Sequence, residues 1–128
     1  MPTFHNDTHL AAPLFPGSHM ATDDRYVFVS GLTVEDIPEG AEALGDIAAE
    51  THCVMSHLER MLGALGASLA SVIRVDVHLT DMDEIGVMDG VYAKFFETGH
   101  YPTRTCTVSP QLYGKARVEI TVMARHPD

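Results

Sequence analysis

The sequence contains no tryptophan, only two cysteines, and only eight lysine and arginine residues in a length of 128. Those eight basic residues stand against 18 acidic ones, which gives a net charge of −10 at neutral pH. Proteins that bind nucleic acid usually carry a basic face, because neutralising phosphates supplies much of their affinity. The charge therefore disfavours general binding to DNA or RNA. A small anionic ligand would have to be bound locally, against the field of the whole protein.

Long apolar runs are also missing, and no stretch of the sequence is long enough to span a bilayer. Residues 1–17 lack the basic region, apolar segment and cleavage site of a secretory signal. These absences lead us to expect a cytoplasmic protein with no membrane partner. In that setting, we do not expect a structural disulfide between Cys53 and Cys106, and buried thiols are the simpler interpretation.

Eight histidines raise the question of a metal site, but their spacing does not support one. His52 and His57 are five residues apart, so they would not share a helix face, and no cysteine or carboxylate completes the set. We expect both to be solvated surface residues. The segment that begins at Asp81 resembles a calcium loop only at its start, because Ile85 and Tyr92 occupy positions that need oxygen ligands. The sequence predicts no metal site.

Hydrophobic periodicity predicts a single α+β domain over residues 1–128. Two amphipathic helices would cover one face of a mixed sheet of five to six strands, and the other face suits burial in an oligomer. On the first helix, Glu50 and His57 fall on the polar side. A capping box is expected where Asp81 is followed by Glu84. The predicted elements are a hairpin over 18–31, helices over 42–66 and 81–99, and strands over 71–81, 103–112 and 116–125.

The strand over 103–112 carries an unusual charge. Arg104, Cys106 and Val108 alternate with threonines, so an arginine lies in the row that otherwise resembles the inner face. A guanidinium removed from water must be paired or must hold an anion. One interpretation is an ion pair with Glu119 on a neighbouring strand. In the other, Arg104 binds a substrate carboxylate and Glu119 faces the same cavity and handles a water molecule.

The segments around these two charges resemble the signature of the RidA (YjgF) family, the reactive-intermediate enamine/imine deaminases. The segment VFVSG at residues 27–31 also resembles the family's strand ending in Ser-Gly, and VYAKFFE at residues 91–97 resembles its second helix. The residues that match the signature itself are Pro102, Arg104, Val118, Glu119, Ile120 and Ala124.

This resemblance implies a chorismate-mutase-like (YjgF-like) fold and a homotrimer with a central barrel, with sites in clefts between subunits. The implied reaction is hydrolytic deamination of a small 2-imino or enamine carboxylic acid to the 2-keto acid and ammonia, with no cofactor. Arg104 would bind the substrate carboxylate and Glu119 would position the water, so both are expected to be catalytic. The resemblance also places Ser30, Gly31 and Cys106 in the substrate pocket.

Three positions depart from the family pattern. The tyrosine of the N-terminal loop aligns with Gly17, and Phe15 is the nearest aromatic residue. Asp89 replaces an asparagine, and Leu32 stands where glutamine often follows Ser-Gly. We therefore include Phe15 and Asp89 among the expected substrate-binding residues. Two alternatives stay open, a deaminase of larger unsaturated amino acids of the aminomuconate type and a non-catalytic trimer that binds small carboxylates. Ribonuclease activity is disfavoured by the acidic charge.

Overall fold

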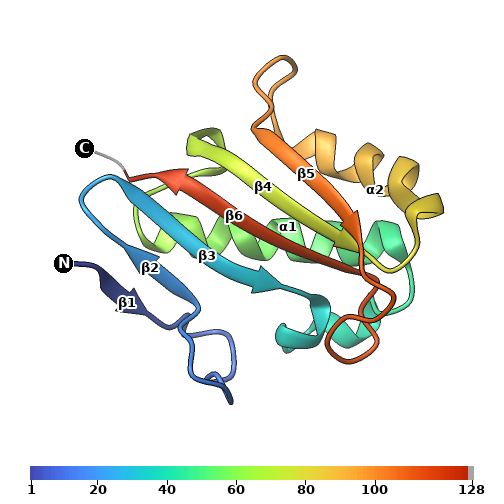
Figure 1. Ribbon diagram of the computed structural model, residues 1–128, viewed down its shortest axis with the longest axis horizontal. Helices are drawn as coiled ribbons and strands as arrows, with labels where there is room; N and C mark the ends of the chain where they lie inside the picture. Colours follow the sequence, from blue (N-terminus) through green and yellow to red (C-terminus); the bar gives the residue numbers. More distant parts are fainter. Residues whose placement is uncertain (127–128) are drawn as a thin grey trace.

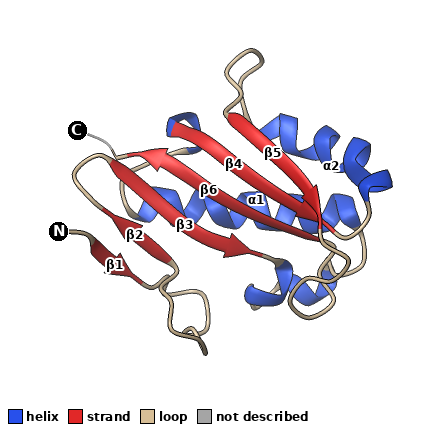
Figure 2. Ribbon diagram, in the orientation of Figure 1, coloured by secondary structure: helices blue, strands red, loops and turns tan. Residues whose placement is uncertain are grey.

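The computed structural model describes residues 1–126, which form one mixed sheet with two helices packed on one of its faces (Figures 1 and 2). The strand order is β1-β2-β3-β6-β4-β5, and β4 and β5 are parallel whereas the other pairs are antiparallel. The α+β prediction is confirmed. The elements are β1 (Thr3–His5), β2 (Met20–Thr22), β3 (Tyr26–Leu32), α1 (Ile47–Ala64), β4 (Val72–Leu79), α2 (Ile85–Tyr92), β5 (Thr103–Val108) and β6 (Val118–Arg125).

Strand β1 is the one strand that periodicity did not predict. It has only three residues, two of which are exposed, so it shows no alternation of apolar and polar side chains. Its pairing with β2 extends the predicted hairpin to a third strand (Figure 1). The edge formed by β1 lies at the opposite end of the sheet from β5.

Helix α1 begins five residues later than predicted. Gly45 has a φ of 95°, which a right-handed helix cannot contain, and the Asp46 side chain then accepts hydrogen bonds from the backbone N–H groups of Ala48 and Ala49. The predicted stop is confirmed, because Gly66 follows the helix with a φ of 79°.

The second helix is shorter than predicted. Helix α2 covers only Ile85–Tyr92, and 3-10 turns flank it at Met82–Glu84 and Ala93–Phe95. Asp81 caps the first turn by accepting a hydrogen bond from the backbone N–H of Asp83. The predicted capping box is wrong, because the Glu84 carboxylate instead accepts from the Arg117 guanidinium at 2.8 Å.

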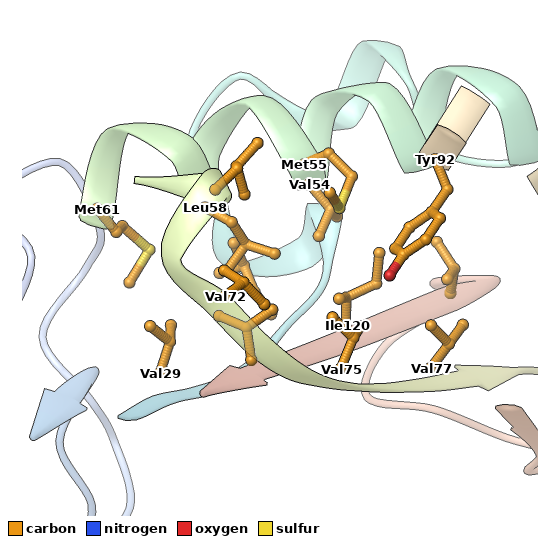
Figure 3. Close-up of a cluster of buried hydrophobic side chains, with 14 of the residues drawn as sticks. Val29, Val54, Met55, Leu58, Met61, Val72, Val75, Val77, Tyr92 and Ile120 are labelled. Carbon is orange, nitrogen blue, oxygen red and sulfur yellow. The ribbon is translucent and has the colours of Figure 1, made fainter. Parts of the chain in front are cut away.

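The core lies between the two helices and the sheet. Figure 3 shows Val54 and Leu58 of α1 directed towards Val75 of β4 and Ile120 of β6. Tyr92 reaches into the same core from α2, and its hydroxyl has no hydrogen-bond partner among the residues the structure describes. Burial of this phenol raises its pKa from 10.0 to about 12.

Two residues expected on the polar side of α1 are in fact buried. Glu50 is fully buried and accepts hydrogen bonds at 2.8 Å from the backbone N–H groups of Gly45 and Arg117. His57 is 4% exposed and its Nε2 lies 3.1 Å from Oδ2 of Asp7. The prediction of a solvated His57 is wrong because a partner from the N-terminal segment satisfies its ring nitrogen, and burial of a paired polar group is inexpensive. His52 is exposed, as predicted.

The helices leave the other face of the sheet uncovered (Figure 2). Its rows include Arg74 and His78 of β4 together with Thr105 and Thr107 of β5, which are joined by side-chain hydrogen bonds of 3.4 and 2.7 Å. None of the described helices is long and apolar enough to cross a membrane. Burial of this uncovered face in an oligomer stays a prediction.

Candidate functional site

The two charges singled out from the sequence lie on different strands that are not neighbours. β4 separates β5, which carries Arg104, from β6, which carries Glu119. Arg104 pairs in register with Val75, and Val75 pairs on its other side with Val122, whereas Glu119 pairs with His78. Strand spacing and rise then put the Cα atoms of Arg104 and Glu119 roughly 14 Å apart. The expectation of adjacent strands is wrong, and the ion pair between these residues is not formed.

The two side chains also project from opposite faces of the sheet. Paired residues on neighbouring strands point to the same face. Arg104 therefore shares the helix side with the buried Val75, and Glu119 shares the open side with His78. Within one chain, Arg104 and Glu119 cannot face one cavity, so each belongs to a separate half of any common site.

The first half-site surrounds Arg104, beside α2. Its Nη1 donates a hydrogen bond of 2.5 Å to Oδ1 of Asp89, and its guanidinium carbon lies 5.0 Å from the centre of the Tyr92 ring. This bond to Asp89 is the main reason that the pKa of Arg104 is raised above its ordinary value. The Arg104 side chain keeps 23% exposure. Its Nε and Nη2 have no partner within residues 1–126, so one edge of the guanidinium is open.

Cys106 lies two residues further along the same row as Arg104 and is half-buried. Burial raises the pKa of its thiol, and the nearby Arg104 only partly opposes that effect. The thiol is therefore mostly protonated at neutral pH and poorly suited to act as a nucleophile. This position supports a role in lining the site, not in covalent chemistry.

The second half-site surrounds Glu119, at the end of β3. A cavity of about 490 Å³ is lined by Phe15, Ser30, Gly31 and Glu119, together with Tyr113 of the loop before β6. The pairing of β3 with β6 shifts register between Val29 and Leu32, which places Ser30 and Gly31 in a bulge. The structure thus brings together four of the predicted site residues here, and Arg104, Asp89 and Cys106 elsewhere.

Glu119 depends on a glycine beside it. A Cβ atom at Gly31 would lie 2.8 Å from Cδ of Glu119, closer than real contacts allow, so only glycine leaves room for this carboxylate. Glu119 is half-buried and has no hydrogen-bond or ion-pair partner in the described part of the chain. Its oxygens are available to accept hydrogen bonds from a ligand or a water molecule.

The N-terminal loop that supplies Phe15 is fixed at both ends. Asp7 pairs with the buried His57, and the backbone N–H of Asp7 donates to Nδ1 of His19 at 2.9 Å. Between these anchors, Phe15 is 62% exposed and lines the cavity with Glu119. Gly17 lies at a separate hollow. Phe15 therefore supplies the aromatic group that the N-terminal loop contributes to the Glu119 half-site, and Gly17 does not line that cavity.

Sequence reasoning missed two aromatic residues of the site. Tyr92 lies under the Arg104 guanidinium, and Tyr113, which is 72% exposed, reaches the Glu119 cavity from the loop before β6. In the sequence, Tyr92 was considered as a calcium-loop position and within the match at residues 91–97, and it is also a core residue. Tyr113 lies between the predicted strands over 103–112 and 116–125, where no periodic pattern distinguishes it. No cluster of three or more histidine, cysteine, aspartate or glutamate residues that could hold a metal occurs within residues 1–126.

Comparison with known proteins identifies the family. Residues 9–126 match the family model described as endoribonuclease L-PSP. The chain belongs to this family, also known as the YjgF or RidA family. The predicted resemblance to RidA proteins is therefore confirmed.

Relatives within the YjgF/RidA family carry different names. A RutC family protein of Pyrococcus horikoshii is 31% identical over 112 residues, which cover 88% of each chain. The 2-iminobutanoate/2-iminopropanoate deaminase of Mus musculus is 28% identical over 117 residues, which cover 91% of this chain and 86% of that protein. The crystal structure of a putative endoribonuclease from Thermotoga maritima covers the whole chain with a TM-score of 0.88 and 29% identity. The two-helix, six-stranded architecture is that of the family.

Proposed function

We propose that this protein hydrolyses a small 2-imino or enamine carboxylic acid to the 2-keto acid and ammonia. The observation that supports this most is that one chain presents two complementary half-sites on opposite faces of its sheet. One offers an arginine with an open edge, and the other offers Glu119, a carboxylate with no partner among the described residues. A relative named as a 2-iminobutanoate/2-iminopropanoate deaminase supports the same reaction class.

In the proposed reaction, the open Nε–Nη2 edge of Arg104 binds the substrate carboxylate through two parallel hydrogen bonds. This orients the neighbouring C=N carbon. Water held by Glu119 attacks that carbon, forming a C–O bond while the π electrons move to nitrogen, and Glu119 accepts the water proton. Glu119 passes this proton to the nitrogen, which gives the carbinolamine. Glu119 then takes the hydroxyl proton as the C=O bond forms, and the nitrogen takes up that proton as the C–N bond breaks, so ammonia leaves and Glu119 is again ionised. These steps use water and protein groups alone, so no cofactor is proposed.

The proposal requires two copies of the chain. Because Arg104 and Glu119 leave opposite faces of the sheet, a substrate can reach both only where one protomer's Arg104 half-site meets another's Glu119 half-site. A homotrimer with three equivalent interfaces would provide this arrangement in a closed ring. The uncovered sheet face would then be buried at its centre.

The test generates the imine in situ with an amino-acid oxidase and follows ammonia release. Imines hydrolyse without help, so the rate is measured above the uncatalysed background. Arg104→Ala should lower kcat/KM by about 100-fold, since the substrate loses a bidentate charged contact. Arg60→Ala is the matched control, because Arg60 is exposed on α1 and makes no described contact. Equal rates for wild type and Arg104→Ala with every imine would overturn the proposal.

Ligand binding without turnover would instead identify a non-catalytic binder of small carboxylates. That result would appear as stabilisation by 2-keto acids in a protein that never exceeds the background rate. The family description names a ribonuclease. Ribonuclease activity is disfavoured here, because a protein with a net charge of −10 would repel the phosphates of an RNA backbone.

A further inference from the structure

The bond between Arg104 and Asp89 changes what the site can bind. Asp89 occupies one nitrogen of the guanidinium and remains 45% exposed, so its carboxylate stays close to any ligand on the open edge. The Arg104–Asp89 pair has no net charge. A single substrate carboxylate still gains two hydrogen bonds from the Nε–Nη2 edge. Once it is bound, Arg104, Asp89 and this carboxylate together carry one net negative charge, which would repel a second carboxylate.

The opposite half-site supplies no second cation. The residues that line the Glu119 cavity include neither lysine nor arginine, and three of them, Glu35, Asp36 and Glu119, are acidic. His19 is the single basic side chain there, and its Nδ1 accepts a hydrogen bond from the backbone N–H of Asp7. A ligand held between the two half-sites would therefore find one effective anion-binding edge and acidic groups around the rest of its surface.

We propose that Asp89 is a specificity-determining residue that restricts this site to 2-imino acids with a single carboxylate and rejects dicarboxylates. This inference rests on the proposed function, which it narrows to the small monocarboxylate class. It argues against the aminomuconate type of substrate, which carries two carboxylates. Asp89 also orients Arg104, because its bond to Nη1 turns the Nε–Nη2 edge away from α2.

The experiment separates the charge of Asp89 from its hydrogen bond. Asp89→Asn keeps an oxygen that can accept from Nη1 but removes the charge, and Asp89→Ala removes both. Asp83→Asn is the control, since it makes the same charge change on an exposed side chain without a described partner. Each variant is assayed with imines made from norleucine and from glutamate, which have similar length and differ in their second carboxylate.

In wild type, kcat/KM for the norleucine imine should be at least about tenfold higher than for the glutamate imine. This is the size expected for repulsion by one like charge about 6 Å away. Asp89→Asn should reduce that preference about tenfold by improving the glutamate imine. Asp89→Ala should also lose preference but lower both rates, because Arg104 is no longer oriented. Asp83→Asn should leave the ratio unchanged. A preference for the norleucine imine that persists in Asp89→Asn would overturn the inference while leaving the deaminase proposal intact.

Binding provides a readout that does not depend on turnover. Calorimetry with 2-oxohexanoate and 2-oxoglutarate should show the same preference in wild type and the same loss of it in Asp89→Asn. If the protein binds these acids selectively but hydrolyses no imine, the deaminase proposal fails and the role of Asp89 stands. If wild type binds neither acid, or binds 2-oxoglutarate at least as tightly as 2-oxohexanoate, the role of Asp89 is wrong.

Discussion

Arg104 and Glu119 lie on opposite faces of one sheet, with β4 between their strands, although β5 and β6 are consecutive along the chain. Neither residue pairs with the other, and each is the polar centre of a different half-site. Under the proposed reaction, a single chain would hold only half of the site, and this determines how the proposal can be tested.

Gly31 should be needed for the position of the Glu119 carboxylate. In Gly31→Ala, the new Cβ would lie 2.8 Å from Cδ of Glu119, so that carboxylate must move. We expect kcat/KM for imine hydrolysis to fall about tenfold or more, because catalysis is sensitive to displacements on the order of 1 Å. Urea unfolding should show a stability loss below about 1 kcal/mol, since the contacted group is the end of a flexible side chain.

The control for that variant is Gly63→Ala. Gly63 is exposed on α1, and a Cβ there would meet nothing within 4 Å. This change should leave activity intact and raise stability by up to about 1 kcal/mol, the difference in helix propensity between the residues. Unchanged activity in Gly31→Ala would show that the position of Glu119 does not matter to the reaction.

Glu50 should contribute strongly to stability. Glu50→Ala would leave the part-buried backbone N–H groups of Gly45 and Arg117 without their acceptor and would open a cavity where the buried Glu50 side chain lies. We expect the free energy of unfolding in urea to fall by roughly 3 kcal/mol. Glu59→Ala on the exposed side of the same helix should change it by less than about 0.5 kcal/mol. Similar losses in the two variants would contradict the structural role of Glu50.

Tyr92 should make stability fall at alkaline pH. Its pKa is raised to about 12 in the folded protein from an ordinary 10.0, so the phenol's contribution is complete below pH 10 and is lost as pH rises towards 12. That loss corresponds to about 2–3 kcal/mol. Tyr92→Phe cannot ionise, so its stability relative to wild type should improve progressively over this range in urea unfolding measurements.

At neutral pH, Tyr92→Phe should be as stable as wild type or up to about 1 kcal/mol more stable. The variant removes a buried hydroxyl that has no partner among the described residues. A loss of more than about 1 kcal/mol at pH 7 would mean that the hydroxyl is hydrogen-bonded in solution. Parallel curves for the two proteins above pH 10 would mean that burial does not raise the pKa of the phenol.

Local pattern was sufficient for most elements of the fold. Alternation predicted the strands that carry Arg104 and Glu119, and Gly66 marked the end of α1. Strand order could not be predicted in the same way, because it depends on where β5 packs after α2. The parallel pairing of β5 with the outer edge of β4 is a long-range choice that alternation within either strand does not encode.

The burial of polar side chains could not be predicted from the sequence either. Periodicity predicted Glu50 and His57 on the exposed side of the helix. Both are buried, and each is hydrogen-bonded to a residue far away in the sequence, Arg117 and Asp7 respectively. The site was partly predictable. Asp89 was identified as a departure from the family pattern. Its bond to Arg104 could not be predicted, because it depends on how α2 packs beside β5.

The most direct test of the two-copy site is complementation between inactive variants. Arg104→Ala and Glu119→Gln would be co-expressed with different tags, and oligomers containing both would be purified through both tags. In a mixed trimer, about a third of the interfaces combine an intact Arg104 with an intact Glu119 from the neighbouring protomer. The account predicts recovery of about a third of wild-type imine hydrolysis. Mixed oligomers no more active than either parent variant would contradict it.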